Sequence, residues 1–461
     1  MEKVCAILLA AGDGKRMKSQ KPKVLCEVLF QPMITWVTNA LAEAGIENCC
    51  AVLGSGVEQV RAVLPEHYAT ALQQERKGTG HAVMMAADYI KSGGFTDVVV
   101  LCGDAPLIKP QDIKAVYGQH KADGNAATVF VAHLSDPAGY GRIVRDKDGG
   151  VSAIVEQADA DPKTQKINEI NAGVYWFDAK FLLEALDGIS TSNAKGEYYL
   201  TDTVGAAVKG DRRVGAYTTH FTAAMGANDR LGLSALNKMA QYYVLDRLLS
   251  DGVDIPFRDQ VVVGPNVKIS ADTTILPGCI LKGDTTIGEG CEIGPNTQLT
   301  NTVVGNGCKV VASFVDSSQL EDGVSIGPMA NIRPGCVIGQ KVKIGDFVEV
   351  KSSVIGAKSA ISHLSYVGDS DVGEGCNLGC GIVTVNYDGK NKHRTVIGSE
   401  SFIGCNTNLI APITLGDRVY CAAGTTLTED VPSEALVIGR CRQTVKENKN
   451  KDGLRFKKSN R

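Results

Sequence analysis

The sequence predicts an α/β protein with two halves of different periodicity. In the N-terminal half, apolar strand-like runs alternate with amphipathic segments, which is typical of a Rossmann-like, mostly parallel sheet with helices on both faces. Beyond Val253, aliphatic residues recur every six positions, which is the hexapeptide signature of a parallel β-helix. We expect one domain over 1–228, a linker helix over 229–252 and a second domain over 253–461.

Length and composition agree with two large folded domains. The chain has 461 residues, of which 44% are hydrophobic, and its net charge of -3 gives no overall attraction to nucleic acid. No apolar run reaches the roughly 18 residues of a membrane-spanning helix. The short apolar run over 4–11 lacks the basic flank of a secretory signal. We therefore expect a cytoplasmic protein whose 14 cysteines are reduced thiols.

In the first half, five apolar runs are predicted strands and two amphipathic segments are predicted helices. The strands are KVCAILLAAG, NCCAVLG, DVVVLCGDAPLI, AATVFVAHL and AGVYWFD, and the helices are MITWVTNALAEAG and TGHAVMMAADYIK. Parallel α/β sheets bind ligands at the carboxyl ends of their strands. Polar residues that directly follow these strands are therefore candidate site residues.

The stretch LLAAGDGKRMKSQKPKVL follows the first strand and resembles a phosphate-binding loop, but it fits neither standard motif. Met17 stands where a dinucleotide fold needs its third glycine, and the Gly-Lys-Ser/Thr ending of a P-loop is absent. Gly12 and Gly14 permit close approach of backbone amides to phosphate oxygens. Arg16 and Lys23 add positive charge suited to a transferring phosphoryl group and a leaving pyrophosphate. A basic surface turn is the alternative.

A carboxylate, Asp104, comes soon after the apolar run over 98–101. A single carboxylate at a strand end suits Mg²⁺, which keeps most of its waters and takes one or two protein ligands together with substrate phosphates. The alternative is an ordinary turn aspartate.

The second half contains three registers of period six, whose members are predicted to point into the β-helix. They are Ile269, Ile275, Leu281, Ile287, Ile293 and Leu299; Leu320, Ile326, Ile332, Ile338, Ile344 and Val350; and Ile397, Ile403, Leu409, Leu415, Cys421 and Leu427. Buried packing at one recurring corner is expected for Cys279, Cys291, Cys308, Cys336 and Cys376. The register breaks over 303–318 and 386–394, where we expect protruding loops.

The motif order makes the resemblance specific. The segments LAAGDGKRMKSQKPKVL, GTGHAV, GDAPL, GYGRIVR, IVEQ, EINAGVY and NDR, followed by a hexapeptide domain, resemble a known family over essentially the full chain. That family is the bacterial bifunctional N-acetylglucosamine-1-phosphate uridyltransferase / glucosamine-1-phosphate N-acetyltransferase. Its hexapeptide β-helix is left-handed, although parallel crossovers are right-handed in about 98% of cases.

The resemblance implies a sugar-nucleotide site in the first domain. The nucleotide would contact Leu9, Ala10, Ala11, Gly12, Lys23, Gln73, Gly78 and Thr79, and the N-acetylglucosamine moiety would contact Gly141, Glu156, Asn171 and Asn228. It further implies that Asp104 and Asn228 hold Mg²⁺ and that Arg16 faces the pyrophosphate. The sugar phosphate would attack UTP and expel pyrophosphate, mainly through positioning and charge neutralisation. Lys15, Arg76 and Cys102 depart from the family pattern.

The resemblance implies an acetyltransferase site in the β-helix. His363, with an ordinary pKa of about 6.5, would accept a proton from the glucosamine amine. A lone histidine on a β-helix is more often a surface residue, and the flanking motif ISHLSYVGD reverses that expectation here. Glu349 is a candidate to orient it. Val348 and Val350 should point inward and alternate with Glu349 and Lys351 outside. Glucosamine phosphate would contact Arg333, Lys351, Tyr366 and Asn377, and acetyl-CoA would contact Cys380, Asn386, Tyr387, Cys405, Ala423 and Arg440.

Together these expectations describe an enzyme that makes UDP-N-acetylglucosamine, a precursor of cell-wall and envelope glycans. The resemblance also implies a homotrimer whose acetyltransferase sites are shared between β-helices. One alternative is a sugar nucleotidyltransferase with a single activity, whose β-helix serves only oligomerisation or regulation. Another is a non-enzymatic subunit that senses sugar nucleotides.

Overall fold

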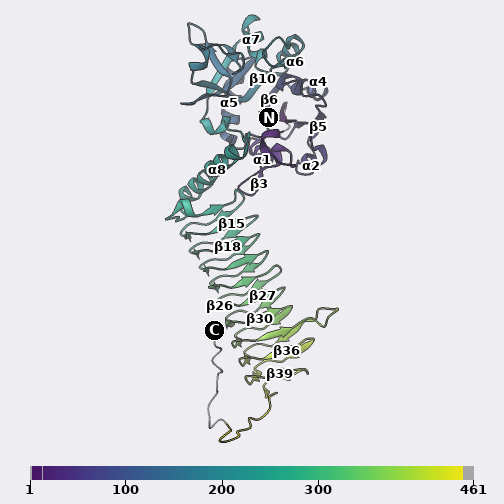
Figure 1. The fold of residues 1–461 in the computed structure, drawn as a ribbon, viewed down its shortest axis with the longest axis vertical. Helices are drawn as coiled ribbons and strands as arrows, with labels where there is room; N and C mark the ends of the chain where they lie inside the picture. Colours follow the sequence, from purple (N-terminus) through teal and green to yellow (C-terminus); the bar gives the residue numbers. More distant parts are fainter. Residues whose placement is uncertain (1–2, 13, 450–461) are drawn as a thin grey trace, which may run out of the picture. The chain divides into compact units, whose positions relative to one another are not determined.

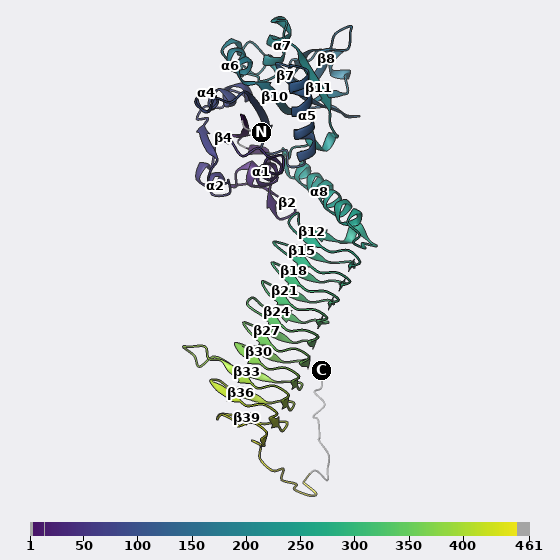
Figure 2. The same ribbon diagram turned by 180° about the vertical axis from the view of Figure 1, so that it is seen from behind.

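The structure is a computed structural model of the chain that describes residues 3–12 and 14–449, shown from opposite sides in Figures 1 and 2. The chain divides into two compact units, Met1–Val244 and Leu245–Arg461. The division falls inside the long helix α8 (Arg230–Ser250), in the region where a linker helix is predicted. The second predicted domain, 253–461, ends in a tail rich in lysine and arginine, and residues 450–461 of this tail lie outside the described residues.

A mixed sheet forms the centre of the first unit. Its main path has the order β11-β7-β10-β6-β1-β4-β5. All neighbours on this path are parallel except β10, which runs antiparallel to both β6 and β7. The strands are β1 (Val4–Ala10), β4 (Cys49–Leu53), β5 (Ala69–Leu72), β6 (Asp97–Cys102), β7 (Ala127–His133), β10 (Glu169–Asp178) and β11 (Val214–Thr218). The mostly parallel α/β fold is confirmed.

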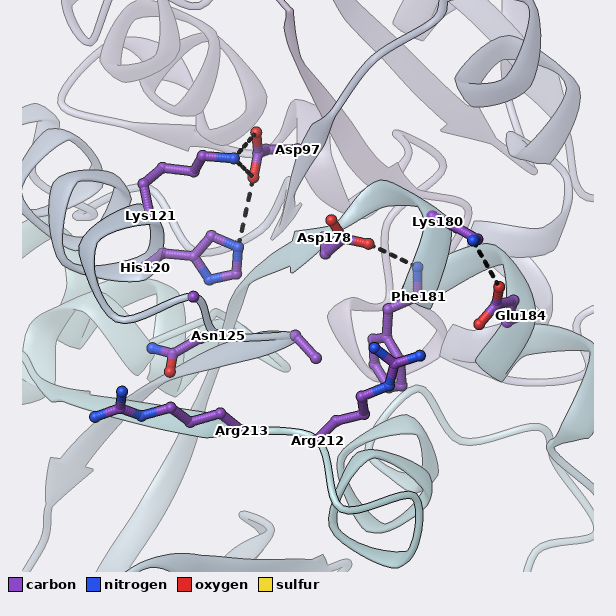
Figure 3. Close-up of a pocket in the computed structure, with 12 residues that line it drawn as sticks. Asp97, His120, Lys121, Asn125, Asp178, Lys180, Phe181, Glu184, Arg212 and Arg213 are labelled. Carbon is purple, nitrogen blue, oxygen red and sulfur yellow. Dashed lines mark hydrogen bonds and ion pairs between the residues drawn. The ribbon is translucent and has the colours of Figure 1, made fainter.

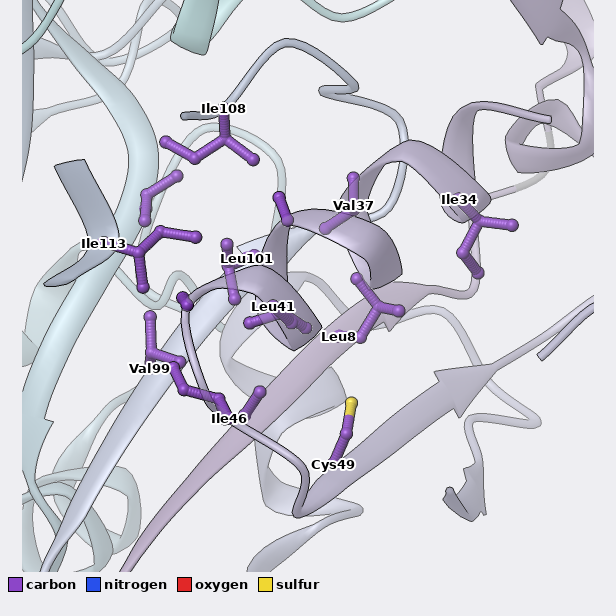
Figure 4. Packing of buried hydrophobic residues seen from close by; sticks show 14 of the residues in the cluster. Leu8, Ile34, Val37, Leu41, Ile46, Cys49, Val99, Leu101, Ile108 and Ile113 are labelled. Atoms are coloured by element: carbon purple, nitrogen blue, oxygen red, sulfur yellow. The ribbon is translucent and has the colours of Figure 1, made fainter. Parts of the chain in front are cut away.

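Helices cover both faces of this sheet because alternate strand residues point to opposite faces. On one face, Leu8, Val99 and Leu101 pack against α1 (Met33–Glu43) and α5 (Pro110–Ala122), as Figure 4 shows. On the other face, Val98 and Val100 pack against α3 (Thr79–Met84), α4 (Ala87–Gly93), α6 (Ala179–Gly188) and α7 (Asp202–Lys209). The sheet therefore has an apolar core on each side, and its strand ends remain for polar groups.

The segment TGHAVMMAADYIK, predicted as one helix, forms two. Helix α3 ends at Met84 and α4 begins at Ala87, because Ala86 has φ -97° and ψ 4° and interrupts the helix. Val83, Ala86 and Ile90 are all buried in the same core. The break therefore lies within a continuous apolar face, which is why the pattern alone did not predict it.

The second unit is a parallel β-helix with three faces, each a long parallel sheet. The first sheet runs from β12 (Val262–Val263) to β39 (Thr426–Leu427), the second from β13 (Lys268–Ile269) to β37 (Ile413–Leu415), and the third from β14 (Thr274–Ile275) to β40 (Leu436–Val437). Every residue of the three predicted registers is buried, with at most 8% of its surface exposed. The arrangement is consistent with the left-handed β-helix that the resemblance implies.

The corner cysteines and the alternation near Lys351 agree with the predictions. Cys279, Cys291, Cys308, Cys336 and Cys376 are all buried. Val348 and Val350 are buried, whereas Glu349 and Lys351 point outward.

The two predicted loops have different outcomes. Residues 303–318 form no protruding loop: they supply β19 (Val303–Val304), β20 (Lys309–Val310) and β21 (Phe314–Asp316), all paired with neighbouring coils. Gln298 pairs with Phe314, 16 residues on, whereas Ile280 pairs with Gln298, 18 residues on. This coil is thus shorter at its corners, but its strands keep their places in the three sheets of the β-helix.

The second predicted loop does protrude. Residues 386–394 leave the β-helix between β33 (Val383–Val385) and β34 (Thr395–Ile397), as Figures 1 and 2 show. Across this loop Ser370 pairs with Thr395, 25 residues on. Within the described residues, no helix is long and apolar enough to cross a membrane.

Candidate active sites

A cavity of about 280 Å³ opens at the carboxyl ends of β1 and β6. It contains most of the nucleotide residues that the resemblance implies, together with the predicted metal ligand Asp104: the nucleotide residues are Leu9, Ala11, Gly12, Lys23, Gln73, Gly78 and Thr79. The remaining lining residues are Val24, Arg76, Ala82, Cys102 and Glu197. Ala10 is buried in the core and is not among the lining residues.

The loop after β1 turns sharply because Gly14 has a left-handed backbone, with φ +59°. A Cβ atom at this position would lie 2.7 Å from the Cβ of Lys23. Only glycine therefore lets Lys23 approach the loop so closely. Arg16 lies exposed on the short 3₁₀ helix η1 (Lys15–Met17) and does not line the cavity. The side chain of Lys15 lies outside the described residues.

Lys23 joins the two residues predicted to hold a metal. Its Nζ donates a 2.8 Å hydrogen bond to Oδ1 of Asn228 and forms an ion pair with Asp104. The side chains of Lys23 and Asp104 are 11% and 25% exposed. Asn228 lies just before α8, 205 residues from Lys23, so tertiary folding brings these groups together. The carboxylate and amide oxygens thus converge on a single cation.

The wall opposite Lys23 is built from the segment over 73–79. Nε2 of the buried Gln73 lies 3.0 Å from both the Gly78 carbonyl oxygen and Nδ1 of His81. Nε of Arg76 donates a 3.0 Å hydrogen bond to the Ala11 carbonyl oxygen. Arg76, which departs from the family pattern, therefore ties this wall to the loop that follows β1.

Cys102, another departure, lies at the end of β6 and lines the same cavity. Burial and the nearby Asp104 carboxylate raise the pKa of this thiol to about 12. A thiol with such a pKa is protonated at neutral pH and is a poor nucleophile. Cys102 therefore contributes shape rather than reactivity.

The residues implied for the sugar form a second group. The Asn171 backbone N–H donates to the Gly141 carbonyl oxygen over 2.9 Å, and the Asn171 side chain donates to the Tyr175 hydroxyl over 2.5 Å. A Cβ at Gly141 would lie 3.6 Å from Oε1 of Glu156. Glu156 accepts a 3.1 Å hydrogen bond from the Thr201 hydroxyl, and burial raises the pKa of its carboxyl group.

This raised pKa predicts a pH-dependent effect of Glu156→Gln. Folding favours the protonated form, so the wild type loses stability relative to the variant as pH rises above the ordinary carboxyl value of 4.5. Glutamine carries no charge to desolvate and can still accept the Thr201 hydrogen bond. We expect the variant to unfold at a higher temperature than wild type at about pH 8, with this gain lost at about pH 4. Thermal unfolding at both pH values tests this.

The matched comparison is Glu169→Gln, because Glu169 accepts a 2.8 Å hydrogen bond from Nε of Arg145. Removing that charge should lower stability at neutral pH. An equal loss of stability in both variants would contradict the buried-charge explanation for Glu156.

A different cavity, of about 340 Å³, lies at the amino end of β6 and is shown in Figure 3. Two of its carboxylates have partners within the protein: Asp97 pairs with Lys121 over 3.0 Å, and Asp178 accepts a 2.8 Å hydrogen bond from the Phe181 backbone N–H. None of the predicted site residues lines it. Size alone therefore does not identify the candidate site.

In the second unit, His363 ends β29 (Ala360–His363) and is paired in register with Asp346, which ends β26 (Lys343–Asp346). Nδ1 of His363 lies 2.7 Å from Oδ1 of Asp346. This hydrogen bond lowers the pKa of the Asp346 carboxyl group. The expected partner, Glu349, instead accepts a 2.9 Å hydrogen bond from Arg333. The suggestion that Glu349 orients His363 is therefore wrong: on the adjacent coil Asp346 is the register partner of His363, whereas Glu349 is paired with Tyr366.

Basic residues gather on the next face of the β-helix, where the chain continues after Asp346. Nζ of Lys351 lies 3.4 Å from Asp369, and Asn386 donates a 2.5 Å hydrogen bond to the same carboxylate. Asn386 also donates to the Tyr366 hydroxyl over 3.3 Å. The site therefore draws residues from β27 (Glu349–Lys351), β30 (Tyr366–Gly368) and the protruding loop.

Sequence reasoning missed Lys392, which lies in the protruding loop. Its ammonium is so close to that of Lys351 that the pKa of Lys392 is lowered, and Arg333 acts in the same direction. Three cationic side chains therefore converge where a strongly anionic group would be stabilised. The basic run KNKHR in this loop was the only signal, and it did not show that the loop folds back.

The residues implied for acetyl-CoA follow a column of corners farther along the β-helix. Cys380, Cys405 and Ala423 occupy successive coils, linked by hydrogen bonds from Asn406 N to Cys380 O over 2.7 Å and from Gly424 N to Cys405 O over 2.8 Å. The Arg440 side chain donates to the Ala423 carbonyl oxygen over 2.8 Å. Tyr387 is 57% exposed, and Asn377 begins β32 (Asn377–Leu378), which pairs with β29.

Comparison with known proteins places the chain. The family model described as nucleotidyl transferase matches residues 5–223. The protein named "Bifunctional protein GlmU" from Thermoanaerobacter pseudethanolicus is 47% identical over 447 residues, covering 97% of both chains. Proteins of the same name from Acetivibrio thermocellus and Geobacillus sp. are 45% and 46% identical over 449 residues, covering 97% of this chain and 97% and 98% of their own lengths. This chain therefore belongs to the family of bifunctional GlmU proteins.

Proposed function

We propose that the chain makes UDP-N-acetylglucosamine in two steps at two separate sites. The second unit transfers an acetyl group from acetyl-CoA to glucosamine 1-phosphate, and the first unit transfers a uridylyl group from UTP to the product. The observation that carries this proposal is the presence of two chemically different sites. One is the Lys23–Asp104–Asn228 group beside a cavity, and the other is the His363–Asp346 pair beside clustered cations.

Uridylyl transfer needs positioning and charge neutralisation rather than a general base. A phosphate oxygen of the sugar phosphate attacks the α-phosphorus of UTP, and the bond to the β-phosphate breaks to release pyrophosphate. Lys23 lies between Gly14 and Asp104, where its ammonium can stabilise the transferring group. Arg16, on the exposed turn η1, would contact the leaving pyrophosphate. Gly141, Glu156 and Asn171 bind the N-acetylglucosamine moiety.

The side chains of Asp104 and Asn228 fit a magnesium ion. They supply a carboxylate and an amide oxygen, which are hard ligands of the type Mg²⁺ prefers, and both already contact a cation, the Lys23 ammonium. When bound, Mg²⁺ would neutralise charge on the triphosphate. Lys23 would then exchange these oxygens for the oxygens of the substrate phosphates.

Acetyl transfer needs a base for the amine of glucosamine 1-phosphate. With Nδ1 of His363 donating to Asp346, Nε2 can accept the proton as the amine nitrogen attacks the thioester carbonyl carbon. The carbon–sulfur bond breaks, and CoA leaves. Asp346 keeps the imidazole oriented, and its lowered pKa keeps it ionised.

The cations beside this pair bind the sugar phosphate. Arg333, Lys351 and Lys392 would hold the phosphate, with Tyr366 and Asn377 contacting the sugar. The column of Cys380, Cys405 and Ala423, together with Asn386, Tyr387 and Arg440, would line the acetyl-CoA groove. UTP and acetyl-CoA as substrates agree with a cytoplasmic enzyme that supplies a precursor of peptidoglycan and lipopolysaccharide.

One coupled assay tests both activities. The protein is incubated with glucosamine 1-phosphate, acetyl-CoA, UTP and Mg²⁺, and free CoA and pyrophosphate are measured separately. We expect both products, and pyrophosphate should depend on prior CoA release. Pyrophosphate formation only when N-acetylglucosamine 1-phosphate is supplied, without CoA release, would favour the single-activity alternative.

The acetyltransferase unit also has an apolar stripe suited to self-association. Met329, Phe347 and Leu364 lie at corners of successive coils, and 59–61% of each side chain is exposed. Their φ values are 59°, 55° and 39°, in the left-handed region that large side chains normally avoid. Strained corners that expose large apolar groups beside His363 support a homotrimer, with copies of this chain covering the stripe and sharing the site.

Phe347→Ser should therefore weaken the trimer. Burying an aromatic side chain stabilises an interface by about 1.5–3 kcal/mol, and three equivalent copies would be lost. Light scattering coupled to gel filtration should show smaller species and a fall in acetyl transfer, while uridylyl transfer persists. Val354→Ser is the control, because Val354 is 45% exposed on a different face, in β28 (Val354–Ile355). A trimer that survives in the double variant Phe347→Ser, Leu364→Ser would contradict this assignment.

A further inference from the structure

The first unit contains a fully buried arginine that the proposed chemistry does not use. Arg142 begins β8 (Arg142–Arg145), and only 1% of its surface is exposed. Within the described residues, the structure gives it no carboxylate partner: its guanidinium donates to oxygens of Tyr140, Gln157 and Gln165. Among the residues that the structure describes, its Nε has no hydrogen-bond partner. Burying a cation whose only partners are neutral oxygens costs free energy of folding. We expect a function of Arg142 to offset this cost.

The guanidinium connects three segments that are separate in sequence. One NH group donates to the carbonyl oxygen of Tyr140, in the turn that precedes β8. The other donates over 2.8 Å to Oε1 of Gln157, which follows β9 (Val151–Val155), and over 3.4 Å to the carbonyl oxygen of Gln165. Oε1 of Gln157 also accepts a 3.1 Å hydrogen bond from the Gly139 backbone N–H. Arg142 and Gln157 thus clamp the turn over 139–141, because Arg142 binds its Tyr140 carbonyl oxygen and Gln157 binds its Gly139 N–H.

The clamped turn contains Gly141, one of the four residues assigned to the sugar, and adjoins two of the others, Glu156 and Asn171. Gly141 directly precedes Arg142, its carbonyl oxygen accepts from Asn171 over 2.9 Å, and Glu156 directly precedes Gln157. Space at Gly141 is limited, because a Cβ there would lie 3.2 Å from Ile154 and 3.6 Å from Glu156. A small shift of the turn would therefore change the distances among Gly141, Glu156 and Asn171.

We propose that Arg142 is a positioning residue for the sugar phosphate acceptor, acting with Gln157 to hold the turn over 139–141 against Glu156 and Asn171. This inference rests on the proposed uridylyl transfer. None of the hydrogen-bond partners that the structure describes for Arg142 lines the nucleotide cavity. UTP binding should therefore not depend on Arg142. A residue with a purely structural role would instead lower stability and affect both substrates alike.

Steady-state kinetics of the full-length protein separate these possibilities. For Arg142→Met we expect the KM for N-acetylglucosamine 1-phosphate to rise roughly 10-fold to 100-fold, because charged hydrogen bonds to the turn are lost. The KM for UTP should change less than about two-fold, and acetyl transfer should be unchanged. Arg142→Lys should restore little, because lysine lacks the planar fork that reaches two segments at once.

Gln157 provides a second route to the same result that leaves the buried arginine in place. Gln157→Leu removes the oxygen shared by Gly139 and Arg142 and should raise the acceptor KM in the same way. Gln157→Glu keeps an acceptor oxygen and should remain near wild type. The double variant Arg142→Met, Gln157→Leu should be no worse than the poorer single variant, because both act through one turn.

Arg145→Met is the matched control, since Arg145 ends the same strand but pairs with Glu169. It should leave the acceptor KM unchanged. If Arg142→Met does not fold, as judged by calorimetric UTP binding, the Gln157 variants decide. Equal KM changes for both substrates in Gln157→Leu, or a wild-type acceptor KM, would overturn the proposal. Failure of the wild type to release pyrophosphate from UTP and sugar phosphate would instead overturn the proposed function.

Discussion

Asp104→Asn is expected to slow uridylyl transfer on the order of 10³-fold while acetyl transfer stays at the wild-type rate. Asp104 supplies the only carboxylate among the residues we assign to the metal, and it is ion-paired with Lys23. Asparagine has nearly the same shape, so the loss would report the charge. Pyrophosphate and CoA release, measured in one sample, give the two rates side by side.

The same strand provides the control for this variant. Asp97 begins β6, whereas Asp104 follows its end, and each aspartate pairs with a lysine. Asp97 is 1% exposed and has hydrogen bonds from Lys121 and from the Thr96 hydroxyl. We expect Asp97→Asn to lower the free energy of unfolding by about 1–3 kcal/mol and to leave kcat unchanged. Asp104→Asn should therefore act mainly on the rate of uridylyl transfer, whereas Asp97→Asn should act mainly on the free energy of unfolding.

A direct measurement of metal binding tests whether Asp104 is a metal ligand. Mn²⁺ binding followed by electron paramagnetic resonance should weaken in Asp104→Asn, in the presence and absence of UTP. Wild-type uridylyl transfer in this variant would contradict the assignment. So would a loss of activity with unchanged Mn²⁺ binding, because Asp104 would then act only through Lys23.

The overall fold could be predicted because its signals are repetitive and local. Each inward residue of a hexapeptide register is buried whatever the rest of the chain does, so period six alone predicted every buried position of the three registers. The prediction of a protruding loop over 303–318 was wrong because a coil can lose residues at its corners and still keep its inward positions. The break at Ala86 was not predicted, because the apolar periodicity continues from α3 across the break into α4.

The sites were predicted less completely because they depend on pairings across the fold. Several carboxylates lie near His363 in the sequence, and only the register between coils shows that Asp346, not Glu349, is beside it. Lys392 contributes only because its loop folds back toward Lys351. The motif GYGRIVR marked Gly141, but nothing in it indicated that Arg142 is buried beneath the turn.

His363→Ala should have the largest effect on the second activity. General-base catalysis contributes typically 10²–10⁴-fold, so we expect acetyl transfer to fall by about that factor while uridylyl transfer stays unchanged. Asp346→Asn should cause a smaller loss, of roughly 10-fold to 100-fold, because the imidazole remains but loses its oriented tautomer. The KM for acetyl-CoA should change little in either variant.

A second histidine of this unit shows whether the effect is specific. Nε2 of His393 lies 2.8 Å from Oδ2 of Asp388, so this pair is built much like His363 and Asp346, but on the protruding loop. If any exposed histidine–carboxylate pair supported the reaction, His393→Ala would reduce the rate as His363→Ala does. We expect His393→Ala to keep kcat, because His363, at the end of β29, is the base that we assign to the amine, whereas His393 is paired with Asp388 within the loop. Near-wild-type acetyl transfer in His363→Ala would show that the base lies elsewhere, and activity restored by added imidazole would show that the imidazole group itself is what the site requires.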